Sequence, residues 1–289
     1  MADPPTSPAD RWDPVYYSTS LGFIARLSAP LQALFTPSPT DHVLDIGCGD
    51  GALTVVLREK VAQGRVVGLD SSAAMISHAR ETYKPSGGSL SFKVHDCSRL
   101  DLKPRGLGDD DGWEGAWDWV FSNSTFHWIL GQPDNRETLL PNISKLLKPG
   151  GHVVFEFGGA GHVADAITAL TAAMVHFGVP AEQRKIVNPW MFPSAEWMRG
   201  KLKGAGFEVV KCETEYRPTK VSLEDGSIEG FVRQLGFMFL DAIAPEEGEK
   251  RDEVVKWVCE LLNESLERQE DGTRWLGFVR LRVLARRPV

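Results

Sequence analysis

Short apolar runs alternate with helix-compatible stretches through the first half of the chain. The apolar runs predict strands over residues 43–46, 66–69, 90–94, 117–121 and 152–157. Helices are expected over residues 52–60, from Ser71 or Ser72 to 80, and over 139–147. Strands that alternate with helices in this way are typical of a parallel sheet covered by helices on both faces.

The alternation changes after the fifth strand. The pattern predicts helices over 164–177 and 194–205, a sixth strand over 207–212, a helical stretch over about 223–270 and a seventh strand over 279–285. Two insertions therefore interrupt the sheet, at 158–193 and 217–275. Both follow the carboxyl ends of strands, where open α/β sheets bind ligands. We interpret them as parts of a lid; the alternative is helical packing on the far side of the sheet.

The expected fold is α/β, with a Rossmann-like, seven-stranded, mostly parallel sheet, helices on both faces and a helical lid. Residues 1–10, with three prolines and two aspartates, predict a disordered tail. Residues 11–35 predict an N-terminal helical lid segment, which Pro30 interrupts. The sheet core is expected to comprise residues 36–157, 194–216 and 276–289.

The sequence Val-Leu-Asp-Ile-Gly-Cys-Gly-Asp-Gly at residues 43–51 is the most informative motif. A buried strand leads into Gly47, Gly49 and Gly51, and a helix follows. Such a turn leaves backbone N–H groups beside open space, so that a carboxylate, phosphate or ribose can lie against the backbone. Asp45 lies within the strand, and a buried carboxylate needs partners such as turn N–H groups or a cationic ligand.

Two classes of ligand use a turn of this kind. Gly47, Gly49 and Ala52 fit the dinucleotide pattern G-x-G-x-x-G/A, with Asp70 about 20 residues further on to hold a ribose. The same stretch fits D-x-G-x-G-x-G, the first motif of S-adenosylmethionine-dependent enzymes. Asp45 favours the second class, because its carboxylate repels a pyrophosphate and attracts an ammonium or sulfonium group.

Composition and charge narrow the range of partners. The chain has 289 residues, a net charge of −7, an isoelectric point near 5.6 and 42 % hydrophobic residues. Without a basic excess, nucleic acid is not an expected partner. The N-terminus does not have the pattern of a signal peptide, and no apolar run reaches the roughly 18 residues of a membrane span, so a cytoplasmic protein without a membrane partner is expected. The four cysteines are far apart, which predicts neither a metal site nor a disulfide framework.

Polar residues follow the strands at the ligand-binding edge. Asp70 ends the second strand and is expected to bind a ribose, with helix capping as the alternative. Asp96 follows the third strand, where it can accept from an adenine amino group or cap a turn. After the fourth strand, Asn123 can contact the amino-acid end of a cofactor. His127 is either a general base or a structural histidine, and Trp128 is expected to form part of a pocket wall.

The motifs over 43–51, 67–75, 94–96, 121–128 and 147–151 occur in the order and spacing of class I methyltransferases. Within that class the chain resembles the trans-aconitate methyltransferases. Trp12-Asp13-Pro14 followed by Tyr17 is similar to that family's N-terminal W-N-P-x-x-Y, and the strand after Phe278 is similar to its C-terminal strand. The resemblance implies S-adenosyl-L-methionine as cofactor. The cofactor-binding residues expected from the motifs are Tyr17, Asp45, Gly47, Cys48, Gly49, Asp70, Ser71, Met75, Asp96, Cys97, Ser98 and Asn123.

The resemblance further implies a small-molecule acceptor, with O-methylation of a carboxylic acid as the favoured reaction. A carboxylate is deprotonated at neutral pH and needs no base, but it needs cations to hold it; Arg26, Arg184 and Arg233 are the candidates. The side chains expected to bind the substrate are Trp128, Trp190, Arg233 and Phe237. Aromatic residues in the insertions predict an acceptor with some hydrophobic surface.

Several alternatives stay open at this point. Transfer to a carbon, a nitrogen or a hydroxyl oxygen of a specialised metabolite uses the same cofactor. An NAD-dependent oxidoreductase uses the same glycine turn, and a binding protein that has lost catalysis can retain the same pocket. The oligomeric state is open, with a monomer favoured.

Overall fold

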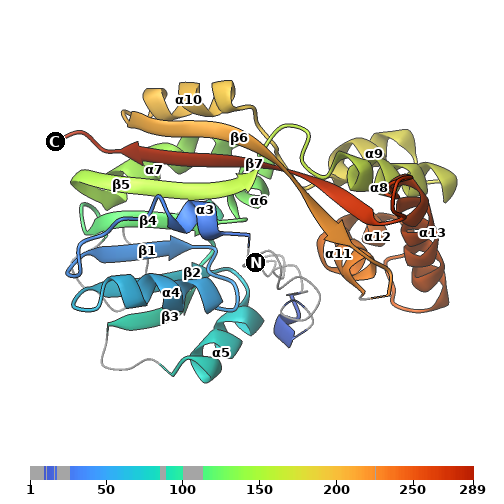
Figure 1. The fold of residues 1–289 in the computed structure, drawn as a ribbon, viewed down its shortest axis with the longest axis horizontal. Coiled ribbons are helices and arrows are strands. Elements are labelled where there is room, and N and C mark those ends of the chain that lie inside the picture. The colour runs from blue at the N-terminus through green and yellow to red at the C-terminus, as the bar shows by residue number, and fades with distance from the viewer. Residues whose placement is uncertain are drawn as a thin grey trace, which may run out of the picture.

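The computed structural model describes residues 10, 12–15, 17, 27–84, 89–99, 113–224 and 226–289. Its centre is a seven-stranded sheet with the strand order β3-β2-β1-β4-β5-β7-β6 (Figure 1). The strands are β1 His42–Ile46, β2 Arg65–Asp70, β3 Leu90–Val94, β4 Trp117–Asn123, β5 Leu147–Gly158, β6 Glu208–Val221 and β7 Arg274–Arg286. All neighbouring pairs are parallel except those that β7 forms with β5 and β6. The predicted Rossmann-like α/β fold is confirmed.

Helices cover both faces of this sheet and enclose two hydrophobic clusters. The helices of this part are α3 Ala29–Gln32, α4 Ala52–Lys60, α5 Ala73–Thr82, α6 Phe126–Gly131, α7 Asn135–Leu146 and α10 Ala195–Gly204. Leu57 and Ile76, from α4 and α5, pack on one face of the sheet. Leu139 and Leu202, from α7 and α10, pack on the other. Pro30 lies at the start of α3, where proline is tolerated, rather than interrupting a longer described helix.

The strands β6 and β7 are longer than the sequence predicted. Their pairing extends from Glu208↔Arg286 to Val221↔Arg274, whereas the pairing of β5 with β7 ends at Gly158↔Arg280. The outer parts of both strands therefore form a two-stranded ribbon that leaves the sheet (Figure 1). The predicted strand over 207–212 corresponds to the first part of β6. The remainder of this edge strand contains Pro218 and charged residues rather than an apolar run, so the sequence did not predict it.

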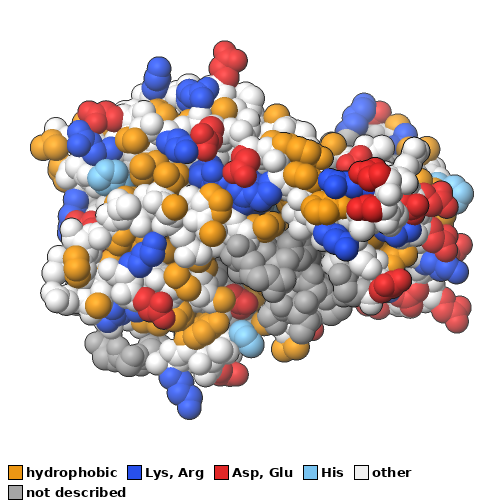
Figure 2. Space-filling view, in the orientation of Figure 1, with side chains coloured by type: hydrophobic (Ala, Val, Ile, Leu, Met, Phe, Trp, Pro, Cys, Tyr) orange, Lys and Arg blue, Asp and Glu red, His pale blue; other side chains and the backbone are white. Residues whose placement is uncertain are grey.

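The ribbon leads to a separate helical lobe (Figure 1). Its helices are α8 Ala164–His176, α9 Ala181–Val187, α11 Ser227–Leu235, α12 Phe237–Ile243 and α13 Glu249–Ser265. The lobe has its own hydrophobic cluster, to which β7 contributes Leu276 and Phe278. Helix α13 buries Val254 and Val258, and its acidic side chains lie among those that gather over the lobe (Figure 2). Within the part of the chain that the structure describes, no helix is long and apolar enough to cross a membrane.

Candidate functional site

The glycine turn after β1 adopts a backbone conformation that L side chains rarely occupy. Gly47 has φ +72° and Gly49 has φ +54°. A Cβ atom at Gly47 would lie 2.0 Å from Thr125 Oγ1, whereas a Cβ atom at Gly49 would meet no atom within 4 Å among the described residues. Gly47 is therefore required by close packing, and Gly49 leaves its backbone open towards the space above the turn.

Asp70 connects this turn to the next helix. Its Oδ2 accepts a hydrogen bond from the Gly49 N–H at 2.9 Å, and its Oδ1 accepts one from the Ser72 N–H at 2.9 Å. Burial raises the pKa of the Asp70 carboxyl, and these backbone donors oppose that rise. Ser72 rather than Ser71 caps α5, since its Oγ accepts from the Met75 N–H at 3.0 Å. These backbone hydrogen bonds hold the Asp70 side chain in one orientation.

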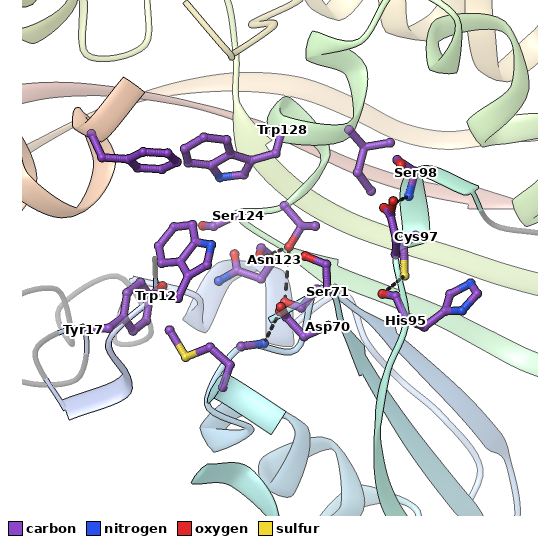
Figure 3. A pocket seen from close by; sticks show the side chains of 17 residues that line it. Trp12, Tyr17, Asp70, Ser71, His95, Cys97, Ser98, Asn123, Ser124 and Trp128 are labelled. Carbon is purple, nitrogen blue, oxygen red and sulfur yellow. Dashed lines mark hydrogen bonds between the residues drawn. The ribbon is translucent and has the colours of Figure 1, made fainter. Parts of the chain in front are cut away.

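A cavity of about 270 Å³ lies above the turn, at the carboxyl ends of β1, β2, β3 and β4 (Figure 3). Nearly all the residues predicted to bind the cofactor line it: Tyr17, Gly47, Gly49, Asp70, Ser71, Met75, Asp96, Cys97, Ser98 and Asn123. Trp128 and Phe237, predicted to bind substrate, line this cavity as well. Its wall also includes five residues that the sequence did not indicate as binding residues: Trp12, His95, Ser124, Thr125 and Ile129.

Asp45 and Cys48 are not among the lining residues. Asp45 is 2 % exposed, and its Oδ2 accepts a hydrogen bond from Thr54 Oγ1 at 2.7 Å. Burial raises its pKa to about 7. Its partner is thus a threonine hydroxyl rather than the turn N–H groups or cationic ligand that the sequence suggested. Cys48 packs in the hydrophobic cluster beneath the turn.

The N-terminal segment reaches this cavity from a distant part of the sequence. Asp10 Oδ2 accepts hydrogen bonds from Ser72 Oγ at 2.8 Å and from the Ala74 N–H at 3.0 Å. The Trp12 ring meets the Tyr17 ring at 5.9 Å and the Trp128 ring at 5.7 Å between centroids (Figure 3). Most of the predicted 1–10 tail, and Arg26 within the predicted 11–35 segment, lie outside the described residues.

A second, smaller chamber of about 60 Å³ adjoins the first, between the sheet and the helical lobe. The residues on the walls of both are Trp12, Tyr17, Ser124 and Trp128. The other lining residues of the smaller chamber are His127, His162, Val163, Trp190, Phe192, Phe231, Leu235, Phe278 and Arg280. Two of its residues have left-handed backbone conformations without being glycine, Ser124 at φ 59° and Val163 at φ 45°. Such strain concentrates at functional sites, and here both strained residues line the same chamber.

Arg280 brings a positive charge to this chamber, although it is only 5 % exposed. Its Nε donates to Glu156 Oε1 at 3.0 Å, and its Nη2 donates to Ser124 Oγ at 2.8 Å. Glu156 also accepts from Arg282 Nε at 2.6 Å and lies 3.5 Å from Arg217 Nη1. Arg217 and Arg282 also pair with Glu215, whereas Arg280 pairs with Glu156 alone among the described carboxylates. Because Arg280 shares this single counter-charge and its Nη2 donates to a neutral hydroxyl, its charge is only partly compensated.

Two of the three arginines proposed to hold a carboxylate lie elsewhere, and the third, Arg26, is outside the described residues. Arg233 pairs with Glu229 at 2.7 Å and with Asp252 at 2.8 Å, and Arg184 donates to the Val179 carbonyl. Neither lines the chamber. Arg280 was missed as a binding residue because it lies between apolar residues of a strand, where the sequence indicates only sheet structure.

His127 has an environment that opposes a charged imidazole. Burial, and to a lesser extent the charge of Arg280, lowers its pKa to about 3. His162, whose Nδ1 lies 2.8 Å from the Val279 carbonyl oxygen, also has its pKa lowered by burial. A histidine with so low a pKa is a weak proton acceptor, so neither ring is suited to be a general base near neutral pH. Within the described residues, no group of three or more His, Cys, Asp or Glu side chains could hold a metal ion.

Comparison with known proteins identifies the class. A methyltransferase domain model matches residues 44–153. The chain is 33 % identical over 213 residues to the uncharacterized methyltransferase C70.08c of Schizosaccharomyces pombe, covering 73 % of this chain and 76 % of that protein. It is 25 % identical over 284 residues to a trans-aconitate 2-methyltransferase of Acidovorax ebreus, covering 96 % and 98 % of the two chains.

A solved structure shares the fold. The phosphoethanolamine N-methyltransferase 2 of Haemonchus contortus, in complex with phosphomonomethylethanolamine and S-adenosylhomocysteine, aligns with a TM-score of 0.54 at 19 % identity. The alignment covers 96 % of this chain and 57 % of that one. The alternative of an NAD-dependent oxidoreductase is wrong, and the cofactor is S-adenosyl-L-methionine. The chain belongs to the class I S-adenosylmethionine-dependent methyltransferases and, within them, resembles the trans-aconitate methyltransferase family.

Proposed function

We propose that this enzyme methylates a carboxylate oxygen of a small molecule. The observation that carries the proposal is Arg280, a buried and partly compensated guanidinium on the wall of the chamber that adjoins the cofactor cavity. Such a group holds a carboxylate through charge-assisted hydrogen bonds. The nearby histidines support the same reaction, because a carboxylate acceptor needs no proton removed.

The residues of the larger cavity fit the cofactor. In this proposal Asp70 accepts hydrogen bonds from the ribose hydroxyls and Asp96, two residues after β3, accepts one from the adenine amino group. The open space beside Gly49 supports a close approach of the ligand to the backbone. When bound, S-adenosylmethionine supplies a methyl group on a sulfonium, so that an O–C bond forms as the S–C bond breaks and sulfur keeps the electron pair. Arg280 would orient the acceptor, and the aromatic walls would exclude water.

The helical lobe and the N-terminal segment are the proposed lid, which corresponds to residues 11–35, 158–193 and 217–275. The lobe supplies Trp190, Phe231 and Leu235 to the acceptor chamber, while the N-terminal segment supplies Trp12 and Tyr17 to both cavities. Hydrogen exchange with and without S-adenosylhomocysteine should show protection in both segments. Protection confined to the glycine turn would remove the lid from the proposal.

The chemistry of the product tests the function. The enzyme is incubated with S-adenosylmethionine labelled in its methyl group and with a mixture of small carboxylic acids, and the product is treated with alkali. A methyl ester releases the label as volatile methanol, whereas a methyl group on carbon, nitrogen or an ether oxygen is retained. Label that survives alkali would assign the enzyme to one of those other acceptors.

A further inference from the structure

We propose that the acceptor is a monocarboxylic acid with an apolar body, rather than a di- or tricarboxylic acid. Its carboxylate is held at Arg280, and its apolar body lies against the aromatic rings of the chamber. This inference rests on the proposed function and names the substrate class for the same site. It separates this enzyme from the trans-aconitate 2-methyltransferases that it resembles, whose named substrate is a tricarboxylic acid.

The charge of the chamber accommodates one carboxylate. Among the described lining residues, Arg280 is the one that carries a full positive charge, because the others are aromatic, aliphatic, hydroxyl or neutral imidazole groups. A second carboxylate of the same molecule would lie against apolar walls without a cation. Uncompensated charge in such surroundings is strongly unfavourable.

Two buried polar atoms support an anionic ligand at this position. Within the described chain, Trp190 Nε1 and His127 Nδ1 have no hydrogen-bond partner, although both residues line the chamber. Buried polar atoms are nearly always partnered in native proteins, so a bound ligand with acceptor atoms can satisfy these two. The indole N–H is a donor only, and a neutral imidazole can carry its proton on Nδ1. Together with Arg280 they match the acceptor-only oxygens of one carboxylate.

The rest of the wall is suited to an apolar body. The Trp190 ring is stacked with Phe192 at 5.9 Å and meets Trp128 edge to face at 5.5 Å. Phe231 and Phe278 are both 3 % exposed. Apolar rings favour hydrocarbon surface and give no partner to a second carboxylate.

Matched pairs of acids test the proposal. Hexanoate is compared with adipate, and phenylacetate with 4-carboxyphenylacetate, because each pair differs only by a second carboxylate; trans-aconitate is included as a tricarboxylate. Alkali-labile methyl transfer gives kcat/KM for each acid. Calorimetry with the S-adenosylhomocysteine-bound enzyme gives its affinity without turnover. The monocarboxylate of each pair should be preferred by about 100-fold or more, the cost expected for an unpaired buried charge.

A gain-of-charge variant provides an independent readout. Leu235 lines the chamber from the lobe and is partly exposed, so a lysine can be accommodated there with its ammonium group near the second carboxylate. Leu235→Lys should reduce the preference for hexanoate over adipate by about tenfold or more. Thermal unfolding of the variant verifies that it folds, and the comparison of acids on the natural enzyme stands without it.

The outcomes separate this inference from the proposed function. Ester formation with adipate or trans-aconitate equal to or better than with the monocarboxylates would overturn the inference and leave carboxylate methylation intact. Alkali-stable products would overturn both. The same holds if the enzyme neither methylates nor binds any acid in the series. Ester formation restricted to the monocarboxylates supports both.

Discussion

Replacement of Asp70 with asparagine tests how the cofactor cavity holds a ribose. The two oxygens of Asp70 accept from the N–H groups of Gly49 and Ser72, each at 2.9 Å. Asparagine has a single oxygen, so its NH₂ group must face one of these two donors. The variant therefore loses one backbone hydrogen bond, the negative charge and an acceptor for a ribose hydroxyl.

The magnitude follows from the kind of bond that is lost. A hydrogen bond to a charged group contributes about 1.5–3 kcal/mol, so a loss of about 2 kcal/mol is expected for the cofactor. At 25 °C this corresponds to a Kd for S-adenosylhomocysteine that is about 30-fold higher. The backbone bond that is lost should also lower the free energy of unfolding of the empty protein by about 1 kcal/mol.

Isothermal titration calorimetry of S-adenosylhomocysteine measures the effect, with circular dichroism to verify the fold. Asp134→Asn is the matched control, because Asp134 precedes α7, makes no capping bond with its side chain and does not line the cavity. A folded Asp70→Asn variant whose Kd lies within about threefold of the natural value would refute the placement of the ribose at Asp70.

Three further changes address the base, the buried acid and the charge cluster. Because the pKa of His127 is lowered to about 3, His127→Gln should reduce kcat by less than about tenfold, and the pH–rate profile of the natural enzyme should show no change of slope near pH 6.5. A loss of about 100-fold in kcat, together with such a change of slope, would indicate that His127 is a general base. The pKa of Asp45 is raised to about 7, so the folded state holds a proton that the unfolded state releases near pH 4, and stability falls as pH rises between these values. In chemical denaturation, the free energy of unfolding of Asp45→Asn should therefore rise relative to that of the natural protein as pH increases from 4 to 7, by on the order of 4 kcal/mol at most. A difference between the two proteins that is constant with pH would contradict this. Glu156→Gln removes the buried carboxylate that Arg217, Arg280 and Arg282 share, and should lower the free energy of unfolding by roughly 3–5 kcal/mol. An unchanged denaturation midpoint would argue against a stabilising role for Glu156.

The features that the sequence predicts correctly are those indicated by residues close together in the chain. Gly47 and Gly49 were singled out because a tight turn between a strand and a helix needs glycine, and the structure gives both a positive φ. Asp70 and Asp96 were identified because acids at the carboxyl ends of parallel strands meet at one edge of the sheet. The seven strands and their mostly parallel arrangement follow from the alternation of strands and helices.

The parts that were missed depend on contacts between distant residues. Arg280 acquires its role through Glu156, 124 residues earlier in the chain, and nothing near Arg280 in the sequence distinguishes it from a strand residue. The pairing of β6 with β7 is stabilised in part by cross-strand ion pairs such as Arg282 with Glu215 at 2.7 Å. The Asp10–Ser72 hydrogen bond likewise joins residues 62 positions apart. Such long-range polar pairs leave no periodicity in the sequence.

The most direct test of the central claim is the value of kcat/KM for an acid substrate in Arg280→Gln. Arg251→Gln is the matched control, because Arg251 is equally buried and ion-paired but pairs with Asp241 on the lobe, away from both cavities. The account predicts that Arg280→Gln lowers kcat/KM by about 100-fold, the usual consequence of removing one partner of a buried charge pair, with an unchanged Kd for S-adenosylhomocysteine. Arg251→Gln should alter stability alone. Equal values of kcat/KM for Arg280→Gln and the natural enzyme would contradict the assignment of Arg280 as the group that holds the acceptor carboxylate.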